Sequence, residues 1–249
     1  MLVLAGSGAM CGAAVLCARA VLASGAGMVK VVTEERNRTP LFCALPEAMA
    51  DFWKEDEPLP EEALLQDLAW ADAVVAGPGL SKSRTAKELL VFTVQHTEVP
   101  LVLDADALNL IAEDAEILSG CRAEKILTPH VGELARLLHM TIAECQRDPA
   151  GSAGRAAEKY QACCVRKDSV TVTAEEGREQ YYINTSGSSA LATAGSGDVL
   201  AGITGAFAAK RQCEKKREKN QPCQNSGTGG ICAWKGGERL RKKKAVLPM

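Results

Sequence analysis

The sequence predicts an α/β protein with a doubly wound, mostly parallel β-sheet and helices on both of its faces. Three observations indicate this fold class. Short apolar runs are followed by Gly-rich or polar loops and then by helical stretches, and this repeated order is typical of parallel sheets covered by helices. The length of 249 residues, with 47% hydrophobic and 24% charged residues, suits one large domain. Because only 4% of the residues are aromatic, we expect a mainly aliphatic core.

The amino-terminal stretch predicts one complete βαβ unit. Residues 2–5 form an apolar strand that ends in a Gly-Ser-Gly turn, and residues 12–23 form a helix of mostly small residues that can pack closely on a sheet. A Ser-Gly-Ala-Gly stretch ends this helix, and the Val-rich residues 28–33 are expected to form the next strand. We expect a right-handed crossover between two parallel strands.

The rest of the chain repeats this order less evenly. Residues 34–70 have weaker periodicity and are expected to form loops and a short helix. The strands predicted after them are residues 73–76, 100–103, 125–128 and 163–165, and the helices are residues 81–96 and 133–139. Thr141 and Glu144 fit a capping box that begins another helix. Residues 169–174 and 180–184 alternate across a turn and therefore predict a β-hairpin.

Polar or Gly-rich clusters follow the ends of several predicted strands. They are residues 6–8, 77–80, 104–109, 128–133 and 194–198. In doubly wound sheets, ligands bind at the carboxyl ends of the strands. One such coincidence would mean little, but five clusters at the same edge predict a binding site.

The last of these clusters, Ala-Gly-Ser-Gly-Asp, ends in Asp198 and leads directly into an apolar helical run over residues 199–209. The first N–H groups of a helix are unpaired and carry partial positive charge, so a Gly-rich turn at this point is suited to bind an anion. Taken alone, Asp198 could simply cap the helix. Its place among the other four clusters favours a functional role.

Charge divides the chain into two parts. From Lys210 onward there are 12 Lys and Arg against 3 Asp and Glu, a net charge of +9, whereas residues 1–209 carry −11. The basic part has no apolar periodicity, so we expect residues 210–249 to be a disordered tail without function. The alternative is a segment that binds nucleic acid or an anionic surface.

Ten Cys residues give no C-x-x-C pair and no zinc-ligand spacing, and several lie within apolar runs. This pattern predicts reduced thiols and a cytoplasmic protein. The first residues lack the basic start and the apolar stretch of a signal peptide. No apolar run approaches the ~20 residues of a transmembrane helix, so no contact with membranes is expected.

Taken together, the motifs resemble the ATP/ADP-dependent NAD(P)H-hydrate dehydratases of the ribokinase-like superfamily. The matching stretches are GSGAMCGAAVLCARAVLASGAGMVKVVT, LPEAM, DAVVAGPGL, PLVLDADALNL, ILTPHVGELARLL and INTSGSSALATAGSGDVLAGITGAF. They cover residues 3–208 in order. DADALN, TPH-x-GE and ATAGSGD are specific as a set in this order.

The resemblance implies a metabolite-repair reaction by a hydro-lyase. These enzymes use ATP or ADP, with Mg²⁺, to phosphorylate the ring hydroxyl of (6S)-hydrated NADH or NADPH. Loss of the phosphate then restores the double bond of the nicotinamide ring. The implied partners are the hydrated dinucleotide and an NAD(P)H-hydrate epimerase, and we expect a homo-oligomer.

The resemblance also implies roles for individual residues. Asp198 is the base that takes the proton from the ring hydroxyl, and the amides of Gly195, Ser196 and Gly197 form an anion hole for the transferred phosphoryl group. The nucleotide-binding residues are Lys167, Asp168, Ser169, Val170, Thr171 and Gly197. Residues Ala13, Gly79 and His130, together with Asp198, contact the hydrated dinucleotide. Asp104 and Asn109 lie near the phosphates and act through metal or water, without a direct protein ligand to the metal.

Each of the other assignments has a simpler alternative. His130 could cap the helix that begins near Gly132, Asp104 and Asp106 could be solvated loop carboxylates, and Lys167 could be a surface residue. Two departures from the family pattern affect the site. Asp168 stands where the family has Gly beside the nucleotide, and Ser81 replaces the second Gly of the GPGLG motif.

The ends of the chain also depart from the family. The resemblance implies further residues upstream of Leu2, often an epimerase domain, so we expect residues 1–209 to be an amino-terminally short dehydratase domain. After residue 209 the family continues with a helix that carries a His-Gly pair, whereas residues 210–249 look disordered or frameshifted. Two alternative functions stay open: a thiazole or pyrimidine kinase of the same superfamily, and an inactive nucleotide-binding remnant.

Overall fold

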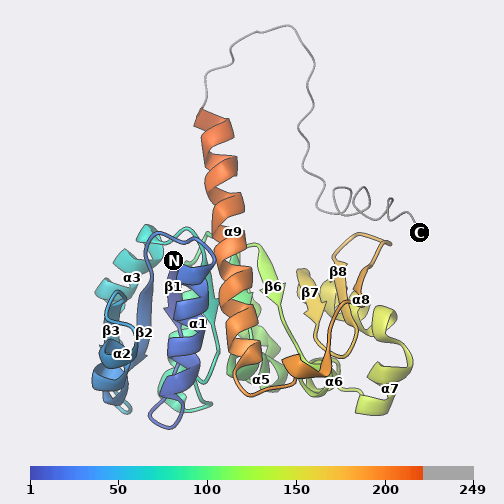
Figure 1. Ribbon diagram of the computed structural model, residues 1–249, viewed down its shortest axis with the longest axis horizontal. Coiled ribbons are helices and arrows are strands. Elements are labelled where there is room, and N and C mark those ends of the chain that lie inside the picture. Colours follow the sequence, from blue (N-terminus) through green and yellow to red (C-terminus); the bar gives the residue numbers. More distant parts are fainter. Residues whose placement is uncertain (221–249) are drawn as a thin grey trace, which may run out of the picture.

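The computed structural model describes residues 1–220, and the strands of this part form one sheet in the order β3-β2-β1-β4-β5-β6-β7-β8-β9 (Figure 1). The strands are β1 (Leu2–Leu4), β2 (Lys30–Glu34), β3 (Met49–Trp53), β4 (Val74–Ala76), β5 (Leu101–Leu103), β6 (Lys125–Leu127), β7 (Ala162–Arg166), β8 (Thr171–Glu175) and β9 (Tyr182–Asn184). Strands β1 to β7 are parallel to one another, and β8 and β9 follow as antiparallel strands next to β7. The predicted fold class is confirmed.

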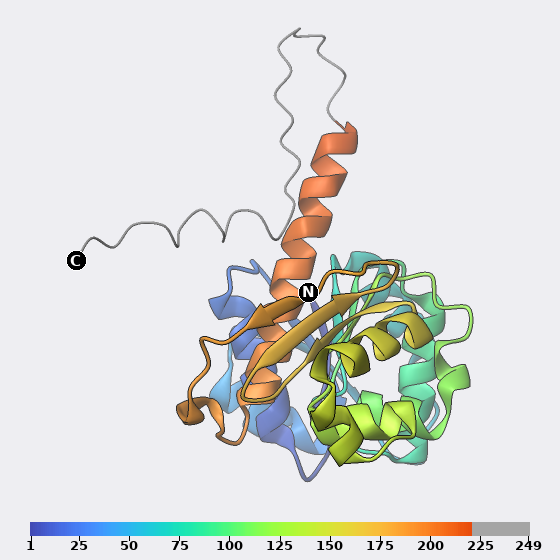
Figure 2. The same cartoon turned by 90° about the vertical axis from the view of Figure 1, so that its right-hand side faces the viewer.

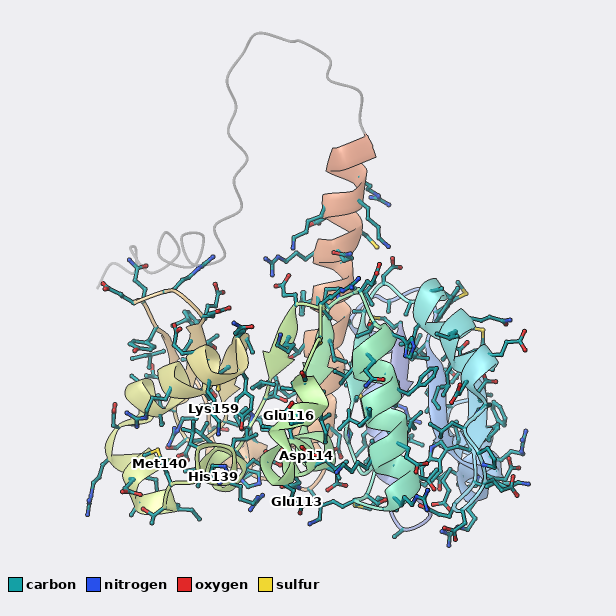
Figure 3. The ribbon with its side chains drawn as sticks, turned by 180° about the vertical axis from the view of Figure 1, so that it is seen from behind. Glu113, Asp114, Glu116, His139, Met140 and Lys159 are labelled. Carbon is teal, nitrogen blue, oxygen red and sulfur yellow. The ribbon has the colours of Figure 1, made fainter. Side chains whose placement is uncertain are left out.

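Helices cover both faces of this sheet. They are α1 (Cys11–Ala23), α2 (Arg38–Ala44), α3 (Glu61–Trp70), α4 (Arg84–His96), α5 (Ala105–Glu113), α6 (Val131–Leu138), α7 (Ile142–Arg147), α8 (Pro149–Tyr160) and α9 (Ser196–Asn220). Helices α1 and α9 lie side by side on one face, and α3, α4 and α5 pack on the other (Figures 1 and 3). The two cores are almost entirely aliphatic, as the composition predicted.

The direction of winding reverses between β1 and β4. The chain builds outward from β1 to β3, returns to place β4 on the other side of β1, and then builds outward again. The loops that follow β1 and β4 meet at this reversal, where the Gly6 amide donates to the Pro78 carbonyl over 2.8 Å. A reversal of this kind opens a crevice at the carboxyl edge of a doubly wound sheet.

The prediction for residues 34–70 was incomplete, because this stretch contains strand β3 and helices α2 and α3 rather than mainly loops. Asp51 lies within β3, where a charged residue hides the strand pattern. Its carboxylate is 3.0 Å from the Lys30 ammonium of β2, and Asp67 of α3 pairs with the same ammonium. The partners that make Asp51 acceptable in a strand are distant in sequence, so periodicity could not reveal them.

Helix α9 continues through Asn220, whereas disorder was predicted from Lys210. Residues 210–220 contain no Gly or Pro and are rich in Lys, Arg and Glu, which have high helix propensity. Ion pairs also hold this part, from Arg211 and Lys215 to Glu124 over 2.5 and 3.2 Å. The remaining predicted tail, residues 221–249, lies outside the described residues.

Within residues 1–220, the helices are all too short or too polar to cross a membrane.

Candidate functional site

The loops after β5, β6 and β7 are joined by one buried carboxylate. Asp104 follows β5 as the N-cap of α5 and is 1% exposed. Its Oδ1 accepts a hydrogen bond from Thr128 Oγ1 over 2.8 Å and pairs with Lys167 Nζ over 2.6 Å. The alternatives of a solvated Asp104 and a surface Lys167 are therefore wrong.

The turn before α9 brings Asp198 to the same place. Gly195 has a φ of +85°, and a Cβ at this position would lie 2.4 Å from Leu16 Cδ1 of α1. A Cβ at Gly197 would lie 3.5 Å from Lys167 Nζ and 3.9 Å from Asp104 Oδ2. The start of α9 therefore lies directly over the buried ion pair, close against α1.

Burial and the charges of Asp104 and Lys167 shift the pKa of the Asp198 carboxyl. Burial raises the pKa of the Asp198 carboxyl above its ordinary value, and the Asp104 carboxylate raises it further, while Lys167 lowers it. Burial disfavours the charged form of a carboxylate and thus strengthens it as a base. The structure places Gly197 and Asp198, in the first turn of α9, next to Asp104 and Lys167. The Ser196 amide donates to the Thr193 carbonyl over 3.2 Å, so its predicted place in an anion hole is not supported, and an anion hole at Gly195 and Gly197 stays a prediction.

The loops after β1 and β4 meet at two of the predicted substrate residues. A Cβ at Gly79, whose φ is +59°, would lie only 2.8 Å from the Ala13 Cβ and 2.9 Å from the Met10 Cβ. Ala13 and Gly79 are thus in close contact, and small residues are needed at both positions. Their contact with substrate stays a prediction.

Close backbone packing positions the DADALN motif, residues 104–109, which is the start of helix α5 and not the polar loop that was expected. A Cβ at Gly77 would lie 1.9 Å from the Asp104 carbonyl oxygen, so only glycine allows the two loops to approach this closely. Ala105 has a φ of +47°, and the neighbouring Asp106 accepts a hydrogen bond from the Ser81 amide over 2.9 Å. Ser81 itself has a φ of +73°, a conformation that suits the Gly found there in the family.

Asn109 lies one turn farther along α5 and contacts neither Asp104 nor Lys167 among the hydrogen bonds of residues 1–220. Its side chain donates to Asp106 over 3.3 Å and accepts from Arg136 Nε over 3.0 Å. A role for Asn109 near the phosphates stays a prediction.

His130 is the N-cap of α6. Its Nδ1 accepts from the amides of Gly132 and Glu133 over 3.0 and 3.4 Å, and the Glu133 side chain accepts from the His130 amide over 2.8 Å. Burial lowers the pKa of His130, and the positive charge of Lys167 lowers it further, consistent with a neutral acceptor. The capping alternative is therefore confirmed, and the half-exposed ring leaves contact with substrate as an additional, untested role.

The predicted nucleotide segment begins beside His130, where the Lys167 amide donates to the Pro129 carbonyl over 2.8 Å. Asp168, the departure from the family pattern, pairs with the buried Arg166 guanidinium over 3.0 Å and also accepts from the Ser169 amide. Arg166 was missed by sequence reasoning, although residues i and i+2 share one side of a strand. This pair offsets the extra negative charge that Asp168 introduces.

Comparison with known proteins places these observations in a family. A family profile, Carb_kinase, described as NAD(P)H-hydrate dehydratase, matches residues 1–234 and so extends beyond residue 208, where the resemblance was expected to end. The chain is 38% identical over 217 residues to the bifunctional NAD(P)H-hydrate repair enzyme Nnr of Moorella thermoacetica, covering 84% of this chain and 40% of that protein. It is 39% identical over 214 residues to the ADP-dependent (S)-NAD(P)H-hydrate dehydratase of Neisseria meningitidis, covering 84% and 68%.

The solved structures agree with the sequence comparisons. The ADP/ATP-dependent NAD(P)H-hydrate dehydratase of Bacillus subtilis, co-crystallised with ATP/Mg²⁺, superposes with a TM-score of 0.68 and 29% identity, covering 84% of this chain and 71% of that one. The chain spans less than half the length of the bifunctional relative. Because the family profile covers most of its length, and the fold is that of a solved ribokinase-like superfamily protein of Enterococcus faecalis, this chain belongs to the NAD(P)H-hydrate dehydratase family.

Proposed function

We propose that this chain catalyses the ADP- or ATP-dependent dehydration of (6S)-hydrated NADH and NADPH. One observation carries the proposal within the family: Asp198 lies in the first turn of α9, which starts next to the buried Asp104–Lys167 pair. This arrangement combines a base, a cation and a set of backbone donors at one point. Phosphoryl transfer depends mainly on such positioning and charge stabilisation.

The geometry fits the phosphates of a nucleotide. Gly197 has no side chain to fill the space beside Lys167, where a Cβ would lie 3.5 Å from the ammonium. We place the nucleotide along residues 167–171, with its phosphates toward the amides of Gly195 and Gly197. Arg166 neutralises Asp168, so the phosphates do not face an uncompensated carboxylate there.

The residues near Asp198 also suit Mg²⁺ carried on nucleotide phosphates. Within residues 1–220, no group of three or more His, Cys, Asp or Glu side chains is placed to hold a metal by itself. Mg²⁺ commonly binds through one or two carboxylates and substrate phosphates, with several waters retained. Asp104 would hold it through water, and the ion would neutralise charge on the phosphates.

The reaction then follows from the chain's own groups. Asp198 accepts the proton of the ring hydroxyl while that oxygen forms a bond to the terminal phosphorus of the nucleotide, and the bond from this phosphorus to the bridging oxygen breaks. The amides at the start of α9 donate to the transferred oxygens, and such donors contribute about 2.7–4 kcal/mol each in comparable sites. The neighbouring ring carbon then loses a proton while the bond from the ring to the phosphate oxygen breaks, so that phosphate leaves and the double bond is restored.

The direct test follows NADH absorbance after hydrated NADH, Mg²⁺ and either ADP or ATP are mixed with the protein. We expect NADH to reappear. Asp198→Asn should lower turnover by roughly 10²–10⁴-fold, because it removes the base. Nucleotide affinity should change little, since the base contacts the hydroxyl rather than the nucleotide.

Asp148→Asn is the matched control, since Asp148 is also a carboxylate at a helix N-terminus but lies outside the five site loops. It should keep full turnover, because Asn caps helices as well as Asp. Full activity in Asp198→Asn would refute the base assignment. Nucleotide binding without NADH formation by the wild-type protein would favour the inactive remnant, and phosphorylation of a small alcohol alone would favour the kinase.

An NAD(P)H-hydrate epimerase as partner, a homo-oligomeric state and a cytoplasmic location stay predictions.

A further inference from the structure

The Asp168 carboxylate lies in the loop between β7 and β8, and both of its oxygens are bound by this chain. Its Oδ2 pairs with Arg166 Nη2 over 3.0 Å, and its Oδ1 accepts a hydrogen bond from the Ser169 amide over 2.8 Å. Guanidinium groups and backbone amides are also the donors with which proteins commonly bind phosphate. Asp168 therefore occupies two donors that could bind an external anion.

The buried guanidinium of Arg166 requires an anion at this point. The residue is 2% exposed, and its Nε has no hydrogen-bond partner within residues 1–220. In the same part of the chain, Asp168 is the one acidic residue that forms an ion pair with it. A buried charge is costly unless it is paired, so the fold is stable here only while Asp168 or a ligand supplies the negative charge.

This loop borders the proposed nucleotide site. Lys167, between the two paired residues, reaches Asp104 over 2.6 Å, and a Cβ at Gly197 would lie 3.5 Å from its ammonium. The segment that leads to α9 also passes the loop, since a Cβ at Gly187 would lie 3.4 Å from the Ser169 carbonyl oxygen. The anion formed by Asp168 is thus next in sequence to the ammonium that is expected to face the phosphates.

We propose that Asp168 is an internal competitor for nucleotide phosphate: its carboxylate occupies Arg166 and the Ser169 amide and so weakens the binding of ADP and ATP by this loop. This inference rests on the proposed function, because it uses the nucleotide position along residues 167–171. A phosphate oxygen that approaches the loop must displace the carboxylate or bind without these two donors. In either case the loop contributes less to nucleotide affinity than its donors allow.

Removal of the carboxylate should free both donors. We expect Asp168→Gly to bind ADP, in the presence of Mg²⁺, about tenfold more tightly than wild type, because Arg166 can then bind a phosphate oxygen. Its affinity for adenosine, which has no phosphate, should equal that of wild type, whereas a rearranged loop would change the binding of both ligands. Isothermal titration calorimetry measures both affinities.

Glu176→Gly is the matched control for the change in charge. Glu176 is exposed in the turn after β8, at the opposite end of this strand from Asp168. The variant removes one negative charge, as Asp168→Gly does, but leaves Arg166 paired. Its affinity for ADP should therefore equal that of wild type.

Arg166→Met distinguishes freed donors from the mere loss of a negative charge, since Met fills a buried position without a charge. If Asp168→Gly acts by freeing Arg166, it should no longer raise ADP affinity when it is added to Arg166→Met. A gain of equal size with and without Arg166 would mean that only the charge of Asp168 matters, and would overturn the proposal.

Inorganic phosphate probes the same donors without nucleotide or turnover. Asp168→Gly leaves Arg166 buried without a partner, so its melting temperature should be below that of wild type. Phosphate should raise this melting temperature more than that of wild type or of the double variant, since a ligand stabilises the state that binds it. This measurement reports on the internal anion even if the wild-type protein forms no NADH and the proposed function fails.

Asp168→Asn is the second variant, for the case that Asp168→Gly does not fold. It keeps a neutral acceptor beside the Ser169 amide, so we expect a smaller gain in ADP affinity that again depends on Arg166. The proposal is overturned if the folded variant binds ADP no more tightly than wild type, or if phosphate stabilises Asp168→Gly no more than the double variant.

Discussion

The two halves of α9 are held to the protein in different ways. From residue 196 to residue 209 the helix packs against α1 and the sheet. A Cβ at Gly202 would lie 2.3 Å from the Cys17 carbonyl oxygen, and one at Gly205 would lie 2.4 Å from Val75 Cγ2. From residue 210 the helix extends away from the body, as Figure 2 shows, with exposed ion pairs to Glu124 and Asp72.

This difference explains why the proposed catalytic Asp198 lies in the first half of α9. Close packing without side chains at Gly202 and Gly205 fixes the first half of the helix, because protein interiors are dense and resist small shifts. Exposed ion pairs contribute little to stability and give weak positional control. Asp198 lies at the tightly packed end, where its carboxylate can be held over the Asp104–Lys167 pair.

The largest effect on stability is expected where the helix backbones of α1 and α9 approach. Gly202→Ala should lower the free energy of unfolding by about 1–3 kcal/mol, because the new methyl group overlaps the Cys17 carbonyl. Urea denaturation measures this loss in the free energy of unfolding. Gly12→Ala is the matched control on α1, since a Cβ there meets nothing within 4 Å. It should raise stability by roughly 0.5–1 kcal/mol, since Ala favours the helix.

Equal stability of the two Ala variants would show that the packed half of α9 can shift without cost. The proposed distinction between the halves would then be wrong, and the precise placement of Asp198 would need another explanation.

A smaller effect is expected at the start of the helix. Because burial and Asp104 raise the pKa of Asp198, the folded state binds more protons than the unfolded state between the ordinary and the raised pKa. Stability therefore falls as pH rises through this window. Asp198→Asn removes the buried charge, so its melting temperature should exceed that of wild type at neutral pH. The gain should shrink as the pH is lowered toward the ordinary value of 3.8.

Differential scanning fluorimetry across this pH range measures the effect, again with Asp148→Asn as the control. A variant less stable than wild type at neutral pH would mean that the Asp198 carboxylate stabilises α9 more than its burial costs. Asp198 would then be foremost a structural residue of the helix.

Sequence patterns predicted the sheet and the clusters that follow its strands, because continuous apolar runs and Gly-rich turns are local signals. One of these clusters was misread as a loop, since residues 105–109 begin helix α5. They could not predict which side chains meet. Strand β3 was missed since Asp51 is acceptable there only beside Lys30, and Asp168 looked out of place without Arg166. His130 shows the opposite case, because its role as a helix cap was an open alternative from the sequence, and the structure confirms it.

The distal half of α9 shows a further limit. Apolar periodicity was used to predict where order ends, but residues 210–220 are helical through propensity and ion pairs. In this segment apolar periodicity and helix propensity disagree, and apolar periodicity gave the wrong end for the ordered part of the chain.

The smallest effect is expected in this distal half. Glu124→Gln removes the partner of both Arg211 and Lys215, whose side chains are about half exposed. The loss in free energy of unfolding should be at most about 1 kcal/mol, and it should disappear at high salt because exposed pairs are screened. Urea denaturation at low and high ionic strength measures it. A loss as large as that of Gly202→Ala, and unaffected by salt, would mean that residues 210–220 belong to the packed structure, so that changes in this segment would also displace Asp198.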